Sequence, residues 1–467
     1  MTMSPSSSGH VNMMKGQPFH VKYREIIRRL MFLIGALVVF RLGAHIPLPG
    51  IDNVALERFF KANEGTFLGL FNMFSGGALE RMSILALGIM PYISASIIVQ
   101  LMSTVVPSLE ALKKEGEQGK RKINQYTRYG TLLLALVQGI GMCAGLISQG
   151  ITLTSGLAFY IPALTSLVAG TMFLMWLGEQ ITERGVGNGI SMIIFAGIVA
   201  GLPNLVIQAF TSVDNGQSSL IMQSFSSVDN GQTSLIGLVV FGLLSIGVLA
   251  AIVFIEKAQR RIPVNYAQKQ QGRRVFTAQQ THLPLKINMA GVIPAIFASS
   301  LLLFPASLGQ WLGSADPNAG IVKRSLQDLA LVLSPGQPLY LVLFGALIIF
   351  FCYFYTALVF SPKEVSENLK RSGAYVPGIR PGEQTARYLD HILNRLTFIG
   401  AIYITVICLM PMILQSSFGI PFHLGGTSLL IVVVVVMDFM AQLQAHLTSH
   451  QYDDQSLMRK TTAHPKG

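Results

Sequence analysis

Long apolar stretches alternate with polar loops along almost the whole chain. A helix of about 20 residues covers the roughly 30 Å hydrocarbon core of a bilayer. The pattern predicts ten spans of about that length, at residues 30–46, 82–106, 129–148, 159–178, 190–210, 235–255, 289–312, 339–360, 396–415 and 426–445. Backbone groups inside lipid must bond to one another, so we expect these spans to be helices. The predicted fold class is an all-α polytopic membrane protein.

Basic residues collect in alternate loops. Of the 34 Lys and Arg residues, 28 lie in the amino-terminal tail 1–29, the even-numbered loops and the carboxy-terminal tail 446–467. The exceptions are Arg41, Arg58, Lys61, Arg81, Lys323 and Arg324. Short cytoplasmic loops carry an excess of positive charge, which places both termini in the cytoplasm.

The composition agrees with a membrane class. Hydrophobic residues make up 51% of the chain and charged residues 12%, which is too little charge for a soluble chain of this length. The net charge of +12 is mostly this topology signal, although a basic face also attracts anionic lipids or a polyanionic partner. The three cysteines lie in apolar stretches without a CxxC or a Cys/His cluster, so we expect no metal, disulfide framework or cofactor.

A short apolar segment precedes the second span. Residues 66–79 are broken by Gly69, Gly76 and Gly77, and Glu80 and Arg81 follow. The segment is too short to cross a bilayer. It is either a re-entrant half-helix buried in protein or an ordinary amphipathic surface loop, and these readings stay open.

Three loops stand out between the spans. The external loop 211–234 belongs to a tandem repeat, in which residues 208–222 are followed by the similar 223–237; two copies are too few for a solenoid. In the cytoplasmic loop 256–288, β-leaning runs flank Gly272 and predict a hairpin. In the cytoplasmic loop 361–395, the turn at 377–382 should present Arg380 at its tip.

The chain lacks the motifs of common enzymes. The Gly-rich run 185–189 follows a membrane helix rather than a strand, so it predicts a break between two helices and not a phosphate loop. Glu179 and Asp438 lie near span ends, where a cap or ion pair is favoured over a proton relay. Sparse charge argues against the alternative function, a secondary transporter of a small solute, which would need polar groups at mid-membrane.

Six ordered segments of the chain resemble the bacterial SecY family of protein-secretion channels. They are residues 71–101, 113–131, 170–191, 281–300, 373–389 and 425–442. The resemblance covers nearly the whole chain from the first span to about Gln442, except the duplicated loop and residues 313–334. It implies two pseudo-symmetric five-helix halves, 30–210 and 235–445, around an hourglass pore.

The resemblance also implies site residues. Residues 66–77 would be a plug in the outer funnel, with the apolar side chains of Phe67, Leu68, Leu70, Phe71, Met73 and Phe74. A pore ring would consist of Ile89, Ile93, Ile190, Ile194, Ile296 and Ile431. Two pairs in this ring are four residues apart, so each pair shares one helix face. A lateral gate would open between spans 82–106 and 129–148 on one side and spans 289–312 and 339–360 on the other.

The implied function is a protein-conducting channel and not an enzyme. It would pass unfolded secretory polypeptides across the bacterial cytoplasmic membrane and release transmembrane segments sideways into lipid. The implied partners are SecE, SecG, the motor SecA, the ribosome, polypeptides bearing signal sequences and membrane lipids. Arg273, Arg274 and Arg380 match positions that contact the motor or the ribosome.

Overall fold

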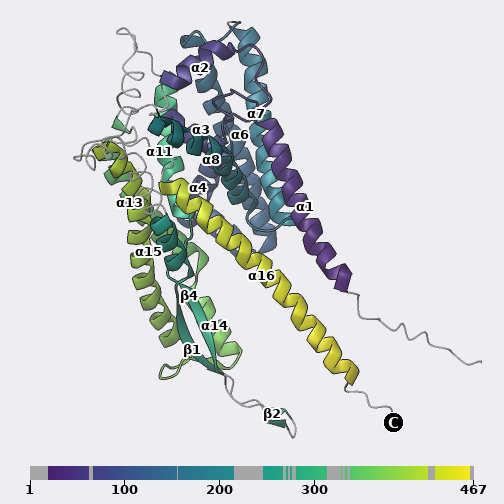
Figure 1. Cartoon of the computed structure of the whole chain (residues 1–467). Coiled ribbons are helices and arrows are strands. Elements are labelled where there is room, and N and C mark those ends of the chain that lie inside the picture. The colour runs from purple at the N-terminus through teal and green to yellow at the C-terminus, as the bar shows by residue number, and fades with distance from the viewer. Residues whose placement is uncertain are drawn as a thin grey trace, which may run out of the picture.

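The structure, a computed structural model, describes residues 19–62, 67–154, 156–214, 246–266, 270–271, 274–275, 280–312, 328, 332–333, 337–418 and 426–462. It is mostly helical (Figure 1). The first group of helices is α1 (Phe19–Gly43), α2 (Asn53–Ala62), α3 (Phe67–Ser75), α4 (Met90–Val105), α5 (Pro107–Lys114), α6 (Glu117–Ser148), α7 (Leu157–Arg184) and α8 (Gly189–Asp214). The second is α11 (Ile293–Leu312), α13 (Pro338–Val359), α14 (Pro362–Arg371), α15 (Glu383–Phe418) and α16 (Gly426–Thr462). Residues 246–257 are also helical.

Several helices are long and apolar enough to cross a membrane. Within the described residues there are five such segments, and a bent pair, α4 with α5, makes up to six. The five segments are Glu117–Ser148, Leu157–Arg184, Pro338–Arg371, Glu383–Ile413 and Gly426–Ala445. Apolar stretches of α8 and α11 are shorter. The chain is therefore a multi-pass membrane protein, and the full set of ten spans stays a prediction.

The predicted second span, 82–106, needs correction at both ends. Its helix, α4, begins only at Met90, because residues 78–89 form hydrogen-bonded turns. At the other end the chain bends by 97° between α4 and α5. Prolines stand in the first turns of both helices, where a missing N–H costs nothing. Hydropathy did not reveal the late start of α4 or the bend, since residues 82–89 are as apolar as the helix.

Other helices extend beyond the apolar spans. Helix α6 begins at Glu117 rather than near 129, and α15 begins at Glu383 rather than near 396. The predicted tail 446–467 continues α16 as a helix to Thr462. Hydropathy marks only the part of a helix that lies in hydrocarbon, so polar helical extensions escape it.

The two long loops 256–288 and 361–395, predicted to be cytoplasmic, fold together. Strand β1 (Gln259–Tyr266) pairs antiparallel with β4 (Gln280–Lys286), and β5 (Ala374–Tyr375) from the second loop joins the other edge of β1. A separate apolar cluster, which includes Ile262, Leu285 and Leu389, ties this sheet to the start of α15. The sheet, α14 and the first turns of α15 together form the sheet module. At the far end of the first loop, β2 (Gln270–Gln271) pairs with β3 (Arg274–Val275), which confirms the predicted hairpin around Gly272.

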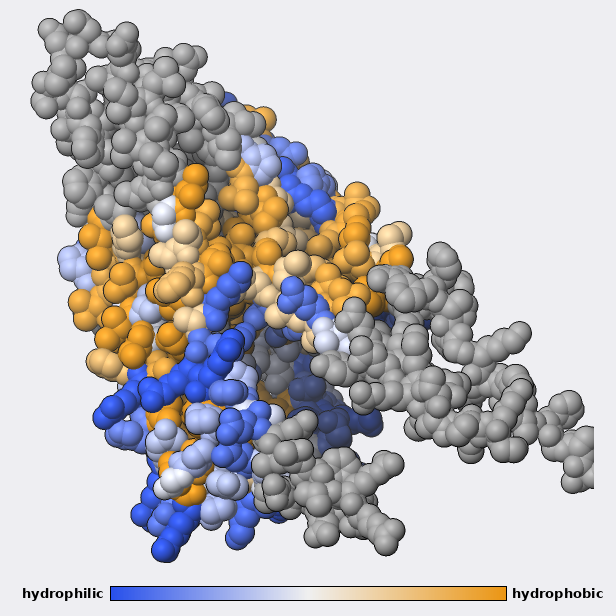
Figure 2. Space-filling model, turned by 60° about the horizontal axis from the view of Figure 1, so that its bottom comes forward, coloured by the Kyte–Doolittle hydropathy of each residue, from blue (hydrophilic) through white to orange (hydrophobic). Residues whose placement is uncertain are grey.

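The main apolar core lies among the membrane helices. Helix α4 packs on α6, and α11 packs on α4, α6 and α13, while α16 contacts α8 and α15. One continuous cluster of buried apolar side chains runs through all of them. Hydrophobic side chains form a broad band on the surface, and hydrophilic ones gather towards the bottom end, where Figure 1 places β1, β4 and α14 (Figure 2). The start of α1 and the end of α16 point towards that same end (Figure 1).

The tandem repeat at 208–237 lies mostly outside the described residues, which end at Asp214 and resume at residue 246. Most of 313–334 and the first 18 residues lie outside them as well. The domain boundaries predicted above stay predictions.

Candidate functional site

The segment that precedes the second span is a short helix. Helix α3 has nine residues, and its side chains Leu68, Phe71 and Phe74 are buried while Met73 is partly buried. It packs against α8 and α11. The structure therefore favours the buried half-helix over the surface loop. Phe67 and Leu70 belong to α3, but their side chains lie outside what the structure describes.

The end of α3 is fixed to two long helices. Gly76 has a φ of +69°, a conformation that favours glycine, and a Cβ there would stand 2.9 Å from the Cα of Gly197 in α8. The guanidinium of Arg41, in the last turn of α1, donates a hydrogen bond of 2.7 Å to the Gly76 carbonyl oxygen. A larger residue at position 76 would push α3 away from α8.

A second anchor joins α3 to the turns that follow it. The side-chain oxygen of Asn72 accepts a hydrogen bond of 3.0 Å from the backbone N–H of Glu80, and its amide donates to the Glu80 carboxylate at 3.2 Å. Since Glu80 follows Gly76 and Gly77, these bonds tie the residues after the two glycines back to α3. The half-helix is thus held at its carboxyl end by both side-chain and backbone contacts.

The six isoleucines belong to the same apolar cluster as α3. Ile89, Ile93, Ile194, Ile296 and Ile431 are each at most 5% exposed, and Ile190 is partly buried. They come from four places in the fold: the start of α4, the start of α8, the first turn of α11 and the start of α16. Their meeting in a ring stays a prediction.

The break between α7 and α8 sets the position of two of these isoleucines. The side-chain oxygen of Asn188 accepts from the backbone N–H of Ile190 at 3.0 Å, which caps the new helix. The hydroxyl of Thr182 accepts from the N–H of Gly189 at 2.8 Å. The Gly-rich run therefore ends one helix and starts the next, as predicted from the sequence.

The helices expected to flank a lateral gate are neighbours. Helices α4 and α6 both pack against α11, and α11 packs against α13. Between α4 and α11, the hydroxyl of Ser300 lies 3.6 Å from the sulfur of Met90. The two sides of the predicted gate therefore touch in this structure.

Both flagged carboxylates near the span ends form ion pairs. The Arg128 guanidinium bonds both oxygens of Glu179, at 2.7 and 3.2 Å, and joins α6 to α7. Asp438 of α16 lies 3.4 Å from the ammonium of Lys286 at the end of β4. The predicted ion-pair role is confirmed for both residues.

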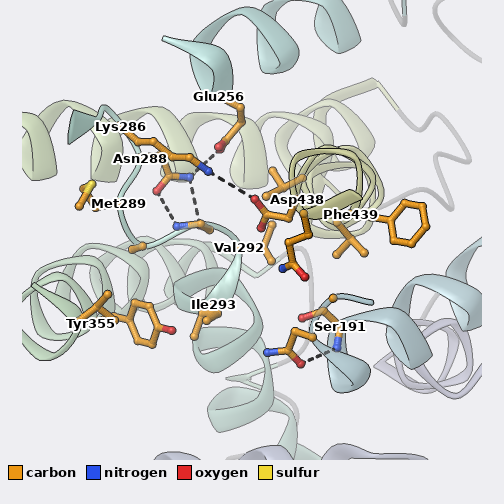
Figure 3. A pocket seen from close by; sticks show the side chains of 18 of the residues that line it. Ser191, Glu256, Lys286, Asn288, Met289, Val292, Ile293, Tyr355, Asp438 and Phe439 are labelled. Atoms are coloured by element: carbon orange, nitrogen blue, oxygen red, sulfur yellow. Dashed lines mark hydrogen bonds and ion pairs between the residues drawn. The ribbon is translucent and has the colours of Figure 1, made fainter. Parts of the chain in front are cut away.

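A pocket of about 210 Å³, lined by both polar and apolar side chains, lies beside the second pair (Figure 3). The break before α8, the start of α11, α13 and α16 line it. On its wall Asn288 donates a hydrogen bond of 2.6 Å to the carboxylate of Glu256, and both side chains are buried. Sequence reasoning missed this pair. The only available signal was its placement, since Glu256 ends one apolar run and Asn288 precedes the next.

The predicted docking arginines have different outcomes. Arg380 is exposed, in a turn whose carbonyl oxygens are held by side chains: Thr385 donates to the Arg380 oxygen at 2.9 Å, and Ser366 donates to that of Gly382. The backbone of Arg274 lies in β3, and its side chain lies outside the described residues, as does all of Arg273. The docking roles of all three arginines stay predictions.

Among the described residues, no group of three or more His, Cys, Asp and Glu side chains is arranged to hold a metal ion. Cys143, Cys352 and Cys408 are free and buried. The described residues therefore provide apolar helices, an anchored half-helix and the sheet module.

Comparison with known proteins decides the family. A family model described as SecY matches residues 83–440. The chain belongs to the SecY family. The protein translocase subunit SecY of Pseudomonas aeruginosa is 62% identical over 93% of this chain and 94% of its own length. The protein translocase subunit SecY of Escherichia coli K12 is 57% identical over 92% of this chain and 93% of its own length.

Solved structures share the SecY fold at low identity. One, whose description says that the plug domain of SecY stabilises the closed channel and maintains a membrane seal, has a TM-score of 0.59 at 17% identity. Canine Sec61 in a ribosome-channel complex has a TM-score of 0.55 at 15% identity. Each likeness covers 91% of this chain and 93% of the other. They support the fold of the family and, at that identity, nothing finer.

Proposed function

We propose that this chain is the channel subunit of a protein translocase, which passes unfolded secretory polypeptides across a membrane and releases apolar helices into lipid. The observation that carries the proposal is the 62% identity, over 93% of the chain, with a subunit of that name. The buried half-helix α3 and the isoleucines in one apolar cluster are consistent with a closed channel.

The architecture that goes with this function has two five-helix halves, 30–210 and 235–445, around an hourglass pore. The contacts of α11 with α4 and α6 support such a meeting of the halves. In the proposed membrane orientation, both termini and the sheet module lie in the cytoplasm of a bacterial cell. Its support is the excess of basic residues on that side and the common direction of α1, α16 and the strands in Figure 1.

The partners in this proposal are SecE, SecG, SecA and the ribosome, together with signal-bearing polypeptides and membrane lipids. The ribosome has support from the Sec61 relative, which was solved in a ribosome-channel complex. Energy comes from ATP hydrolysis by SecA, translation or the membrane potential. The subunit itself carries out no covalent chemistry and needs no cofactor.

The alternative, a secondary transporter of a small solute, has no support among the relatives. A solute carrier needs polar groups that converge near the bilayer midplane. Glu179 and Asp438 are instead each paired with a basic residue, Arg128 and Lys286.

A stalled secretory precursor tests the proposal directly. A photo-crosslinker at position 93 or 296 should label a precursor halted in the channel, because both side chains are buried on the proposed pore wall. Positions 98 and 301 are matched controls on the same helices, since Ile98 is 47% and Leu301 is 39% exposed. Labelling of the exposed pair but not the buried pair would contradict a path through this cluster.

Removal of residues 66–77 should raise the permeability of the resting channel to ions, because it takes away α3. The smaller change Arg41→Met should act in the same direction but less, since it removes only the bond to the Gly76 carbonyl. The measurement is the conductance of purified channels in planar bilayers. Arg58→Met, at an exposed site in α2, is the control and should leave the conductance unchanged. An unchanged conductance after the deletion would show that α3 is not a required seal.

A further inference from the structure

The root of the β1–β4 hairpin meets the membrane helices at one compact junction. Glu256 is the next-to-last of the helical residues 246–257, and β1 begins at Gln259, directly after Ala258. Asn288 lies between the end of β4 at Lys286 and the start of α11 at Ile293. A contact between the two side chains therefore joins the two helices at the point where the hairpin leaves them.

Asn288 uses its whole amide at this junction. Its Nδ2 donates to Glu256 Oε1 at 2.6 Å and to the carbonyl oxygen of Gly291 at 3.1 Å, and its Oδ1 accepts from the Gly291 N–H at 3.0 Å. Asn288 is 4% exposed and Glu256 is 6% exposed. Hydrogen bonds to a charged partner are roughly twice as strong as neutral ones. The Glu256–Asn288 pair is called the clasp below.

The clasp acts on the part of α11 that carries a predicted pore residue. Gly291 has a φ of +62°, so the chain turns sharply there before the helix starts. The N–H of Ile296 then bonds to the carbonyl oxygen of Val292, which places Ile296 in the first turn. Each helical residue turns the side-chain direction by about 100°, so a change at 288–291 would redirect Ile296.

A buried carboxylate is a costly way to fasten two helices. Burial raises the pKa of Glu256, while the bond from Asn288 and the charge of Lys286 oppose that rise. Well-packed apolar side chains often give equal or greater stability than buried polar pairs. The clasp therefore fixes the orientation of the turn before α11, and it adds little to the free energy of unfolding.

We propose that the clasp is a positioning device that holds α11 in its resting orientation and so keeps Ile296 in the closed channel. This inference rests on the proposed channel function. Glu256 and Asn288 do not contact the polypeptide in this role; they act through α11. Loss of the clasp should leave export running and weaken the closed state.

The test uses four single variants and one double variant in the full chain. Glu256→Gln keeps an oxygen that accepts from Asn288, Glu256→Leu removes it, and Asn288→Asp keeps the volume but loses both donors. Glu179→Leu is the matched control, since it breaks an ion pair between α6 and α7 without touching the clasp. The readouts are resting ion conductance, export of a precursor with a defective signal sequence, and the melting temperature in detergent.

Glu256→Leu and Asn288→Asp should each raise conductance and defective-precursor export by about tenfold, which corresponds to about 1.4 kcal/mol lost from the closed state. Glu256→Gln should behave as the parent, and Glu179→Leu should lower the melting temperature without raising either readout. The double variant Glu256→Leu with Asn288→Asp should exceed neither single variant, because both remove one interaction.

Two results would overturn the clasp. One is equal behaviour of Glu256→Gln and Glu256→Leu; the other is parental conductance and export in Asn288→Asp, which preserves the packing volume if the leucine variant fails to accumulate. Neither result bears on the channel function itself. That function fails instead if a stalled precursor does not label positions 93 and 296 in the parent chain.

Discussion

Ile93→Ser will raise the resting ion conductance of the channel about tenfold, whereas Ile98→Ser will leave it nearly unchanged. Both isoleucines lie in α4, but Ile93 is 3% exposed within the apolar cluster and Ile98 is 47% exposed. Hydrophobic constrictions block ions because water withdraws from them. A hydroxyl at the neck holds water there, and a loss of about 1.4 kcal/mol from the closed state multiplies the open population by about ten.

The same reasoning extends to the other predicted ring positions. Serine at Ile89, Ile190, Ile194, Ile296 or Ile431 should also ease the passage of precursors with defective signals, because a weaker closed state needs less energy to open. Planar-bilayer conductance and export assays measure the two effects. Equal leak from Ile93→Ser and Ile98→Ser would mean that the damage is general to α4, and the ring would lose its assignment.

Arg380→Glu will reduce transport driven by SecA at least tenfold while the variant still inserts and accumulates normally. Arg380 is exposed in a turn that Thr385 and Ser366 hold in place, so a change of its side chain leaves the backbone undisturbed. Glutamate at this site repels an acidic partner surface. It also lacks the planar guanidinium of arginine, which holds a carboxylate through two parallel hydrogen bonds. We expect at least a tenfold drop in transport of a secretory precursor into membrane vesicles, or about 1.4 kcal/mol of docking energy.

Two further substitutions separate position from net charge. Arg371→Glu changes the net charge of the sheet module by the same amount, at an exposed site at the end of α14, and should reduce transport far less. Arg380→Lys keeps the charge without the planar fork and should fall between the parent and Arg380→Glu. If Arg371→Glu is as damaging as Arg380→Glu, the general charge of the face matters and the turn has no special role.

Local features of the chain were well predicted from the sequence. The helix break at 185–189 and the hairpin around Gly272 both follow from nearby residue types. Each depends on short-range rules, such as capping by Asn188 or turn formation at glycine. Membrane location also followed, because hydropathy averages over a length that matches the bilayer.

Features that depend on distant residues or on backbone geometry escaped prediction. Residues 82–89 are as apolar as α4, yet they fold into turns, so an average of hydropathy merges them with the helix. The bond between Glu256 and Asn288 joins residues 32 apart, and β5 reaches β1 across more than 100 residues. The predicted pore ring rests on family resemblance, since its six isoleucines share their residue type with many packing positions.

The pairing of β5 with β1 has a consequence for how partners share this protein. Asn265 of the first loop lies opposite Tyr375 of the second, so the hairpin and the Arg380 turn belong to one body. A partner that grips both sites gains avidity, because the second contact forms at a high effective concentration. While that partner is bound, a second partner has no access to the hairpin or to the Arg380 turn. The motor and the ribosome would have to take turns on one channel, and the choice between them would be made at this three-stranded sheet.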